Sequence, residues 1–262
     1  RRAAETARAM GKIRVKTPAE IEKMRRAGRL VARALDLVRR EAAPGVTTAE
    51  LDRMVEDLIR REGGTPAFKG YRGFPASICT SINEQVVHGI PGDRELKEGE
   101  LLSVDIGAFV EGYAGDAAVT VLIGECEKIA EKLCRATEES LQAAIRVVRP
   151  GMQVSDIGRA VQEVVDRYGF SIVEKYTGHG IGKELHEPPQ IPNYARQPSL
   201  SSSPVVPEGA VLAIEPMVNV GTPHTRVLND GWTVVTRDKS LSAHFEHTVA
   251  VTAEGADVLT RL

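Results

Sequence analysis

The sequence lacks the features that mark membrane, secreted and nucleic-acid-binding proteins. None of its apolar segments approaches the roughly 18 uninterrupted residues needed to span a bilayer, and no secretory signal is visible. Its three cysteines include no C-x-x-C pair, which argues against a disulfide framework or a thiolate zinc site. The net charge of −2 gives no reason to expect nucleic acid or an anionic membrane as a partner. We therefore expect a cytoplasmic enzyme.

Aromatic residues are also scarce, at 4% of the chain, although 42% of its 262 residues are hydrophobic. A chain of this length can bury a large core, either as one domain or as two fused halves. Its first residues, RRAAETARA, fit no core pattern and could be a basic extension, part of a targeting peptide or an added sequence. We expect residues 1–16 to be a poorly ordered extension and residues 17–262 to form a single catalytic domain.

That domain is predicted to consist of two similar halves, about 17–124 and 125–262. TPAE at Thr17–Glu20 is a capping box followed by apolar residues at helical spacing, and Pro44–Gly45 ends that helix. TTAE then begins a second helix. The same order returns in the second half, where a helix ends at Pro150–Gly151 and another apolar helix follows. A shift of 106 residues aligns the two helix pairs.

The strands repeat as well, and each repeated strand carries an acid. EGELLSVD, which ends at Asp105, matches EGAVLAIE, which ends at Glu215, at a shift of 110 residues. GDAAVTV around Asp116 resembles FEHTVAV around Glu246. Four matches in the same order indicate a duplication. Halves related by a pseudo-twofold axis would bring the four acids together, with Asp105 facing Glu215 and Asp116 facing Glu246.

Four carboxylates cannot share one site unaided, because like charges at close range disfavour ionisation. Two divalent cations would balance their charge, and two-metal hydrolases use carboxylates to bridge their ions. A neutral imidazole would add no charge, and His179 in TGHGIG is a candidate. His88 and His186 also lie in glycine- or proline-flanked segments, whereas His244 and His247, beside Glu246, are not expected to be ligands. Oxygen-rich sites with one imidazole suit Mn, Fe, Co or Zn.

Seven motifs resemble, in order and spacing, the methionine aminopeptidases of the pita-bread fold, peptidase family M24: VVHGIPGD, LLSVDIG, GDAAVT, TGHGIG, LHEPP, IEPM and FEHT. The resemblance runs from about Thr17 to the end of the chain. The short interval between His186 and Glu215 leaves no room for the helical insertion of the type II enzymes, so the chain resembles type I. The implied fold is α+β, with two duplicated ααββ-type halves around a central curved antiparallel sheet.

The resemblance also implies roles for individual residues. Two divalent metal ions, Co, Mn, Fe or Zn, would be held by five ligands: Asp105, Asp116, His179, Glu215 and Glu246. Asp116 and Glu246 would bridge the ions. Glu215 would double as general base, His186 would stabilise the oxyanion, and His88 would bond the substrate.

The resemblance places a methionine pocket beside these ligands. Its expected residues are Tyr71, Phe74, Cys79 and Trp232, with Leu185, His88 and His186 at its edge. Thioethers pack well against aromatic edges, although in an arbitrary protein these aromatic residues would more often be ordinary core. The family usually has threonine at the position of Ala117 and an aromatic residue at that of Leu185. The second departure predicts a slightly roomier pocket.

The implied activity is metal-dependent removal of N-terminal methionine when the second residue is small. Expected partners are peptide and nascent-chain N-termini, with the ribosome as a further candidate, and the chain is expected to be a monomer without nucleic-acid or membrane partners. Alternatives are a prolidase or aminopeptidase P, a non-catalytic binding module, and a plain structural protein. HGIP and LHEPP favour the methionine enzyme over the proline-directed ones. Intact ligands argue against the binding module, and a structural protein leaves the aligned acids unexplained. Metal-dependent release of methionine from Met-Ala-Ser would separate these readings.

Overall fold

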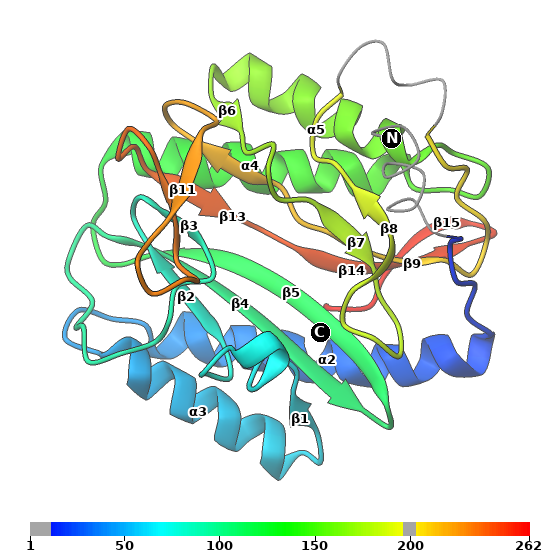
Figure 1. The fold of residues 1–262 in the computed structure, drawn as a ribbon, viewed down its shortest axis with the longest axis horizontal. Helices are drawn as coiled ribbons and strands as arrows, with labels where there is room; N and C mark the ends of the chain where they lie inside the picture. Colours follow the sequence, from blue (N-terminus) through cyan, green and yellow to red (C-terminus); the bar gives the residue numbers. More distant parts are fainter. Residues whose placement is uncertain (1–11, 196–202) are drawn as a thin grey trace.

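The computed structural model describes residues 12–195 and 203–262, and its elements follow the predicted duplication. The α-helices form two pairs on either side of the strands in the view of Figure 1. They are α2 (Pro18–Glu41) with α3 (Thr48–Arg61), and α4 (Lys128–Val147) with α5 (Val154–Tyr168). Between the pairs lie strands β1 (Thr65–Pro66), β2 (Cys79–Ile82), β3 (Gln85–Val87), β4 (Leu101–Val110), β5 (Tyr113–Leu122), β6 (Ser171–Ile172), β7 (Gly178–Gly180), β8 (Glu187–Ile191), β9 (Val211–Ile214), β10 (Met217–Asn219), β11 (Thr225–Val227), β12 (Val234–Thr236), β13 (Ser242–His244), β14 (His247–Thr252) and β15 (Gly255–Val258).

The first helix pair begins at the predicted capping boxes. The Thr17 hydroxyl accepts a hydrogen bond from the Glu20 amide, and the Glu20 carboxylate accepts one from the Thr17 amide. Thr47 and Glu50 repeat this arrangement at α3. Each box satisfies amides that the first helical turn leaves without partners. The sequence therefore sets where both helices start, and so which stripe of each one faces the core.

Two antiparallel groups of strands meet at the centre of the molecule. β4 and β5 form a hairpin, and β14 pairs with β9, which in turn pairs with β7. Ala118 of β5 and Glu246, directly before β14, exchange two backbone hydrogen bonds, with N···O distances of 2.9 and 3.4 Å. Beside them, the Thr248 hydroxyl bonds both the amide and the carbonyl of Asp116. We call this junction the β5–β14 seam, and it joins the first half of the chain to the second.

Side chains alternate between the two faces of these strands. On one face, residues such as Val104, Ile106 and Leu212 join a single buried cluster that also contains Leu35 of α2 and Leu141 of α4. Because strand residues alternate in direction, the acids at positions 105 and 116 point to the opposite face. The helices therefore cover one face and leave the other for the site.

The observed fold agrees with the expected α+β duplication, but the N-terminal prediction needs correction. Residues 1–11 lie outside the described part of the chain. Residues 12–16 do not behave as an extension, because the Lys16 amide donates to Gly209 O at 2.8 Å and its side chain is buried. The expected boundary near residue 124 falls between β5 and α4. No helix in the two described ranges has the length and apolarity that a membrane crossing requires.

Candidate active site

One row of side chains crosses the strands on the face away from the helices. Asp105 lies opposite Ala118, and Ala118 lies opposite Glu246 across the β5–β14 seam. Glu215 directly follows Ile214, which is paired with the residue directly after Glu246, so the ladder sets Glu215 beside Glu246. Antiparallel partners share a face of the sheet. Three of the predicted acids therefore converge along this row.

A second row lies two residues further along the same strands. Asp116 is opposite Gly107 on one side and bonded to Thr248 on the other. Thr248 pairs with Ala213, which pairs with His179. The fourth acid and the imidazole therefore share this row, directly beside the first.

The residues between the acids and His179 are small. Ala118, Thr248 and Ala213 occupy the intervening positions of the two rows. A larger side chain at any of them would fill the space into which the acids and His179 point. The rows also correct the expected pairing, because Glu246 lies opposite Ala118 and is only a diagonal neighbour of Asp116. The halves thus repeat the face of each strand but not its register.

His179 is oriented by its own backbone. A Cβ at Gly180 would lie 2.1 Å from the Pro188 carbonyl oxygen, so only glycine lets the neighbouring strand approach here. The Nδ1 of His179 lies 2.9 Å from the Gly180 carbonyl oxygen, which can only accept, so Nδ1 carries the proton. In the neutral ring the lone pair is then on Nε2, which is 3.4 Å from Glu215 and 3.9 Å from Asp116. A free Nε2 lone pair is the form in which histidine binds metals.

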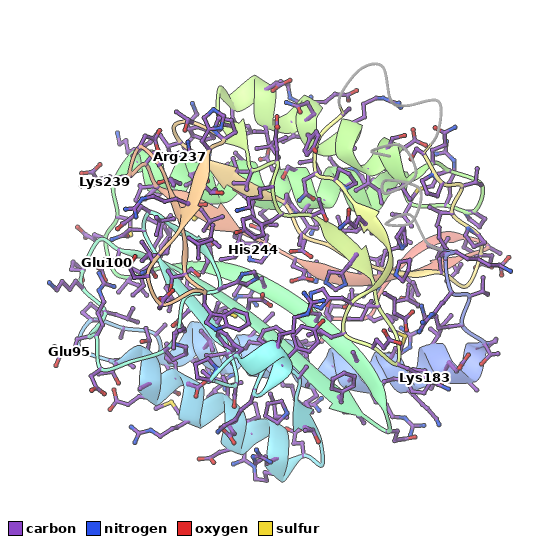
Figure 2. All side chains as sticks on the ribbon, in the orientation of Figure 1. Glu95, Glu100, Lys183, Arg237, Lys239 and His244 are labelled. Atoms are coloured by element: carbon purple, nitrogen blue, oxygen red, sulfur yellow. The ribbon has the colours of Figure 1, made fainter. Side chains whose placement is uncertain are left out.

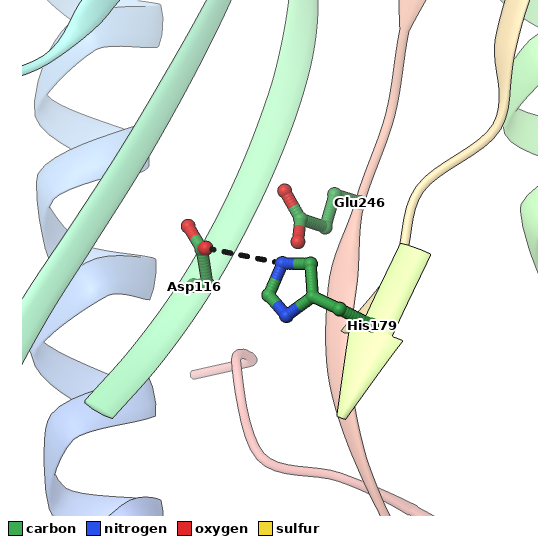
Figure 3. A group of neighbouring side chains, drawn as sticks. All are labelled: Asp116, His179 and Glu246. Carbon is green, nitrogen blue, oxygen red and sulfur yellow. Dashed lines mark ion pairs between the residues drawn. The ribbon is translucent and has the colours of Figure 1, made fainter. Parts of the chain in front are cut away.

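Figure 3 shows Asp116, His179 and Glu246 pointing toward one another from three different strand segments. One potential ligand atom from each lies within 4.8 Å of the others. A second group with the same property contains Glu215, Glu246 and His244. Glu246 belongs to both groups, as a carboxylate that bridges two ions would.

The acids are strongly perturbed by their surroundings. Burial raises the pKa of Asp105 to about 7. Burial, reinforced by the neighbouring carboxylates, raises the pKa of Asp116, Glu215 and Glu246 well above the usual range. Burial also lowers the pKa of His179 to about 4, which keeps the ring neutral. The protein alone therefore favours the protonated forms of Asp116, Glu215 and Glu246 at neutral pH.

Several buried oxygens in the described part of the chain have no partner there. They include Asp105 Oδ1, Asp116 Oδ1 and Glu246 Oε1. Leaving a buried carboxylate oxygen unsatisfied costs several kcal/mol, and divalent cations would satisfy all three at once. Oxygen donors with one imidazole fit Mn, Fe, Co or Zn. The site therefore fits divalent metal ions.

A pocket opens above the four acids and His179, which form what we call its floor. All the residues expected to contact the substrate line the wall of this pocket. They are Tyr71, Phe74, Cys79, His88, Leu185, His186 and Trp232. The edge of Phe74 meets Trp232 with ring centroids 5.1 Å apart. Cys79 is buried, and burial raises the pKa of its thiol well above the usual range, so it is an apolar wall residue. The pocket is thus aromatic at its wall and acidic at its floor.

The two histidines of the pocket are held differently. His186 Nδ1 lies 2.9 Å from the Tyr71 hydroxyl, and the two rings are stacked with centroids 5.3 Å apart. His88 has a φ of 60°, an uncommon and strained conformation outside glycine, and its ring meets Trp232 edge-on. Partial burial lowers the pKa of both rings, so both are neutral at pH 7.

Sequence reasoning missed two residues that line the pocket. Phe68 and Arg72 lie on the segment that carries Tyr71 and Phe74. His244, which was not expected to be a ligand, has its Nε2 3.9 Å from Glu215 Oε2, and neither ring nitrogen has a hydrogen-bond partner among the described residues. Figure 2 shows His244 near the centre of the molecule, far from surface residues such as Lys239. The sequence spacing indicates this position, because His244 precedes Glu246 by two residues and strand residues two apart share a face.

The chain was compared with known proteins. Residues 22–253 match the sequence model of Metallopeptidase family M24. A methionine aminopeptidase of Clostridium acetobutylicum is 50% identical over 247 residues, which cover 94% of this chain and 98% of that protein. The crystal structure of methionine aminopeptidase from Thermotoga maritima superposes with a TM-score of 0.93 at 46% identity, covering 96% of this chain and 100% of that one. The expected pita-bread fold is thereby confirmed.

A proline-directed enzyme shares the fold at a greater distance. The prolidase from Pyrococcus furiosus superposes with a TM-score of 0.76 at 24% identity, covering 99% of this chain and 68% of that one. At this identity the likeness concerns the fold alone.

Proposed function

Because the chain belongs to metallopeptidase family M24, we propose that it is a metal-dependent aminopeptidase that removes N-terminal methionine when the second residue is small. The observation that carries the proposal is the convergence of four carboxylates and one imidazole at the floor of an aromatic pocket. Methionine suits such a wall, because its thioether packs against ring edges. Relatives named methionine aminopeptidase over nearly the whole chain support it further.

The metal ligands in this proposal are Asp105, Asp116, His179, Glu215 and Glu246. Asp116 and Glu246, which are diagonal neighbours across the β5–β14 seam, would each contact both ions. When bound, such ions lower the pKa of a coordinated water and polarise a carbonyl oxygen. Metal analysis of the purified protein would identify which of Co, Mn, Fe and Zn it binds.

The protein's own groups then act on the peptide. Glu215 Oε accepts the proton of the attacking water and later passes it to the departing amine, as a general base and acid. His186 Nε2 donates to the carbonyl oxygen as negative charge develops there. The Tyr71 hydroxyl donates to His186 Nδ1, which leaves the single proton of the neutral ring on Nε2. His88 bonds the scissile amide.

The floor explains why one residue is removed at a time. In this proposal the floor residues would hold the free amino group of the peptide N-terminus through the ions that they bind, so only the first residue lies beyond the scissile bond. Acetylation converts that amine into an amide, which is a poor metal ligand. An acetylated peptide is therefore not a substrate.

Steady-state kinetics on Xaa-Ala-Ser peptides, free and N-acetylated, test the proposal. We expect kcat/KM to be highest for methionine, low for leucine and norleucine, and absent for the acetylated peptide. Equal kcat/KM for alanine and methionine at the first position would contradict the pocket. Cleavage of Xaa-Pro peptides in preference to Met-Ala-Ser would make the protein a proline-directed enzyme instead.

Three further expectations remain predictions: action on nascent chains at the ribosome, a cytoplasmic location and a monomeric state. Co-sedimentation with ribosomes tests the first. Fractionation of cells and analytical ultracentrifugation test the other two.

A further inference from the structure

A short N-terminal segment, residues 12–17, runs beside the loop 182–187 that carries His186. The Lys16 Nζ donates to Glu187 Oε2 at 2.9 Å and to the Arg14 carbonyl oxygen at 3.0 Å. The side chains of Lys16 and Glu187 are only 6% and 2% exposed. The Lys16 amide is tied to the Gly209 carbonyl oxygen, so the segment is anchored on its other side as well.

Glu187 is also the residue that closes the loop. Its second oxygen, Oε1, accepts a hydrogen bond from the Glu184 amide at 3.4 Å. The Gly182 amide donates to the Glu184 carbonyl oxygen, and the Gly182 carbonyl oxygen accepts from the Ala114 amide. The Glu187 carboxylate thus links Lys16 to the Glu184 amide, two residues before His186, and Glu187 itself directly follows His186.

The loop is built to admit this ion pair. A Cβ at Gly182 would lie 2.6 Å from Glu187 Oε1 and 2.7 Å from Lys16 Cε. Any larger residue at position 182 would therefore displace the Lys16 and Glu187 side chains. The pair occupies a space that only glycine leaves open.

Stability alone does not account for a buried pair of this kind. Removing two charges from water costs several kcal/mol per ion, and replacing a buried pair by apolar residues is often neutral or stabilising. Burial lowers the pKa of Lys16, which reflects that desolvation, while the bond to Glu187 opposes it. An apolar pair would fill the space, but it could not hold the Glu184 amide.

We propose that the Lys16–Glu187 ion pair is a positioning device that holds His186 within reach of the substrate carbonyl. The inference rests on the proposed function, because it assumes that His186 acts on that carbonyl. Lys16 and Glu187 are positioning residues in this scheme, since neither lines the pocket.

The test compares single and double variants. Lys16→Met removes the buried partner of Glu187 Oε2 and leaves that buried carboxylate with only the exposed Arg14, 3.5 Å from Oε1, as a cationic partner, so it lowers both the melting temperature and kcat. Lys16→Met/Glu187→Met removes both charges, so the melting temperature returns toward the wild-type value while kcat stays lowered, by up to the about 10²–10³-fold that one oxyanion donor contributes. KM and bound metal remain unchanged. A double variant with wild-type kcat overturns the proposal.

Arg14→Ala is the matched control. Arg14 also bonds Glu184 and Glu187, but its side chain is 52% exposed, and exposed pairs contribute little. We expect its kcat and melting temperature to stay close to wild type. A loss of kcat equal to that of the double variant would mean that general disturbance of the loop is responsible.

Epistasis with His186 separates positioning from a merely structural role. In a His186→Ala background, the Lys16→Met/Glu187→Met change should lower kcat no further, because the residue through which it acts is gone. Multiplicative losses would overturn the proposal.

Hydrogen exchange gives a readout that does not depend on activity. We expect faster exchange at the amides of loop 182–187 in the double variant and wild-type exchange in Arg14→Ala. Unchanged exchange in the double variant overturns the positioning role even if the enzyme is active. If wild-type protein does not cleave Met-Ala-Ser at all, the proposed function fails while the exchange result still stands on its own.

Discussion

The floor and the wall of the pocket are built in different ways. The floor lies on long paired strands, where backbone register sets the relative position of Asp105, Asp116 and Glu246. The wall lies on loops and on short elements such as the turn Tyr71–Gly73. In paired strands, backbone hydrogen bonds fix where each side chain lies, whatever that side chain is. A loop depends on the particular residues that pack and bond within it.

The wall accordingly shows more backbone strain than the floor. Positive φ angles occur at Arg72 and His88, whereas Asp105, Asp116 and Glu246 have none. Strained residues persist only where the surroundings hold them. We infer that substitution of a floor residue abolishes activity, because its charge is needed. Substitution of a wall residue changes the shape of the pocket and alters activity or specificity by degrees.

Replacing a bridging acid should have the largest effect. Asp116→Asn or Glu246→Gln should abolish turnover of Met-Ala-Ser, because a bridging carboxylate serves both ions and an amide cannot replace its charge. Metal analysis of the purified variants should show lowered metal content. Glu184→Gln, an exposed change outside the floor, is the control. Wild-type activity in either bridging variant would exclude the dinuclear site.

Removing metal should make the stability of the floor depend on pH. With ions chelated, Asp105 has a folded pKa of about 7, above the ordinary value of about 3.9 for an unfolded chain. The folded state then binds more protons than the unfolded state between these values, so stability falls as pH rises from about 4 to 7. Melting scans with a chelator should show this fall, Asp105→Asn should reduce it, and added Mn²⁺ should reverse it. A pH-independent melting temperature in chelator would contradict the buried acids.

His186→Ala tests the wall at its most reactive point. We expect kcat to drop by about 10²–10³-fold, the usual cost of losing one oxyanion donor, with metal retained. Measuring kcat and metal content on the same preparation of the variant tests this expectation. Loss of metal from this variant would show that His186 is a ligand and belongs to the floor.

Tyr71→Phe should have a smaller effect on the same histidine. Without the hydroxyl, neutral His186 no longer favours the form with its proton on Nε2, so kcat should fall by roughly 5-fold, which corresponds to one hydrogen bond of about 1 kcal/mol. The ring stacking is preserved by phenylalanine. A loss as large as that of His186→Ala would mean that the tyrosine itself contacts the substrate.

Leu185→Phe should produce the smallest change, in specificity alone. A ring at this buried position would narrow the pocket, so kcat/KM for leucine and norleucine peptides should fall about 10-fold relative to methionine, as expected for about one methylene of fit. Cleavage of Met-Ala-Ser should stay within a few-fold of wild type. Equal losses of kcat/KM for all three peptides would show that the residue at position 185 does not determine which N-terminal side chain is accepted.

The floor was predictable from residue patterns, and the wall was not. The repeated acids at 105 and 215 and at 116 and 246 indicated a duplication, and a duplication implies that they converge. The register escaped prediction, because a shift of two residues between the halves preserves the face of each strand and leaves the pattern unchanged. Only the family resemblance placed Tyr71, Phe74 and Trp232 at the pocket. Residues in loops follow no regular spacing from which their contacts could be predicted. Phe68 and Arg72 were missed for the same reason, because they lie on the irregular segment around Tyr71.

The β5–β14 seam has a consequence for the timing of folding. The first half of the chain contributes Asp105 and Asp116, and the second contributes His179, Glu215 and Glu246, so neither half holds all five proposed ligands. A ribosome synthesising this protein makes β14 long after β5, and the metal site cannot form until the two have paired. The newborn enzyme is therefore inactive toward every N-terminus, including its own, until β14 has emerged. Metal binding during synthesis would report on the formation of the β5–β14 seam.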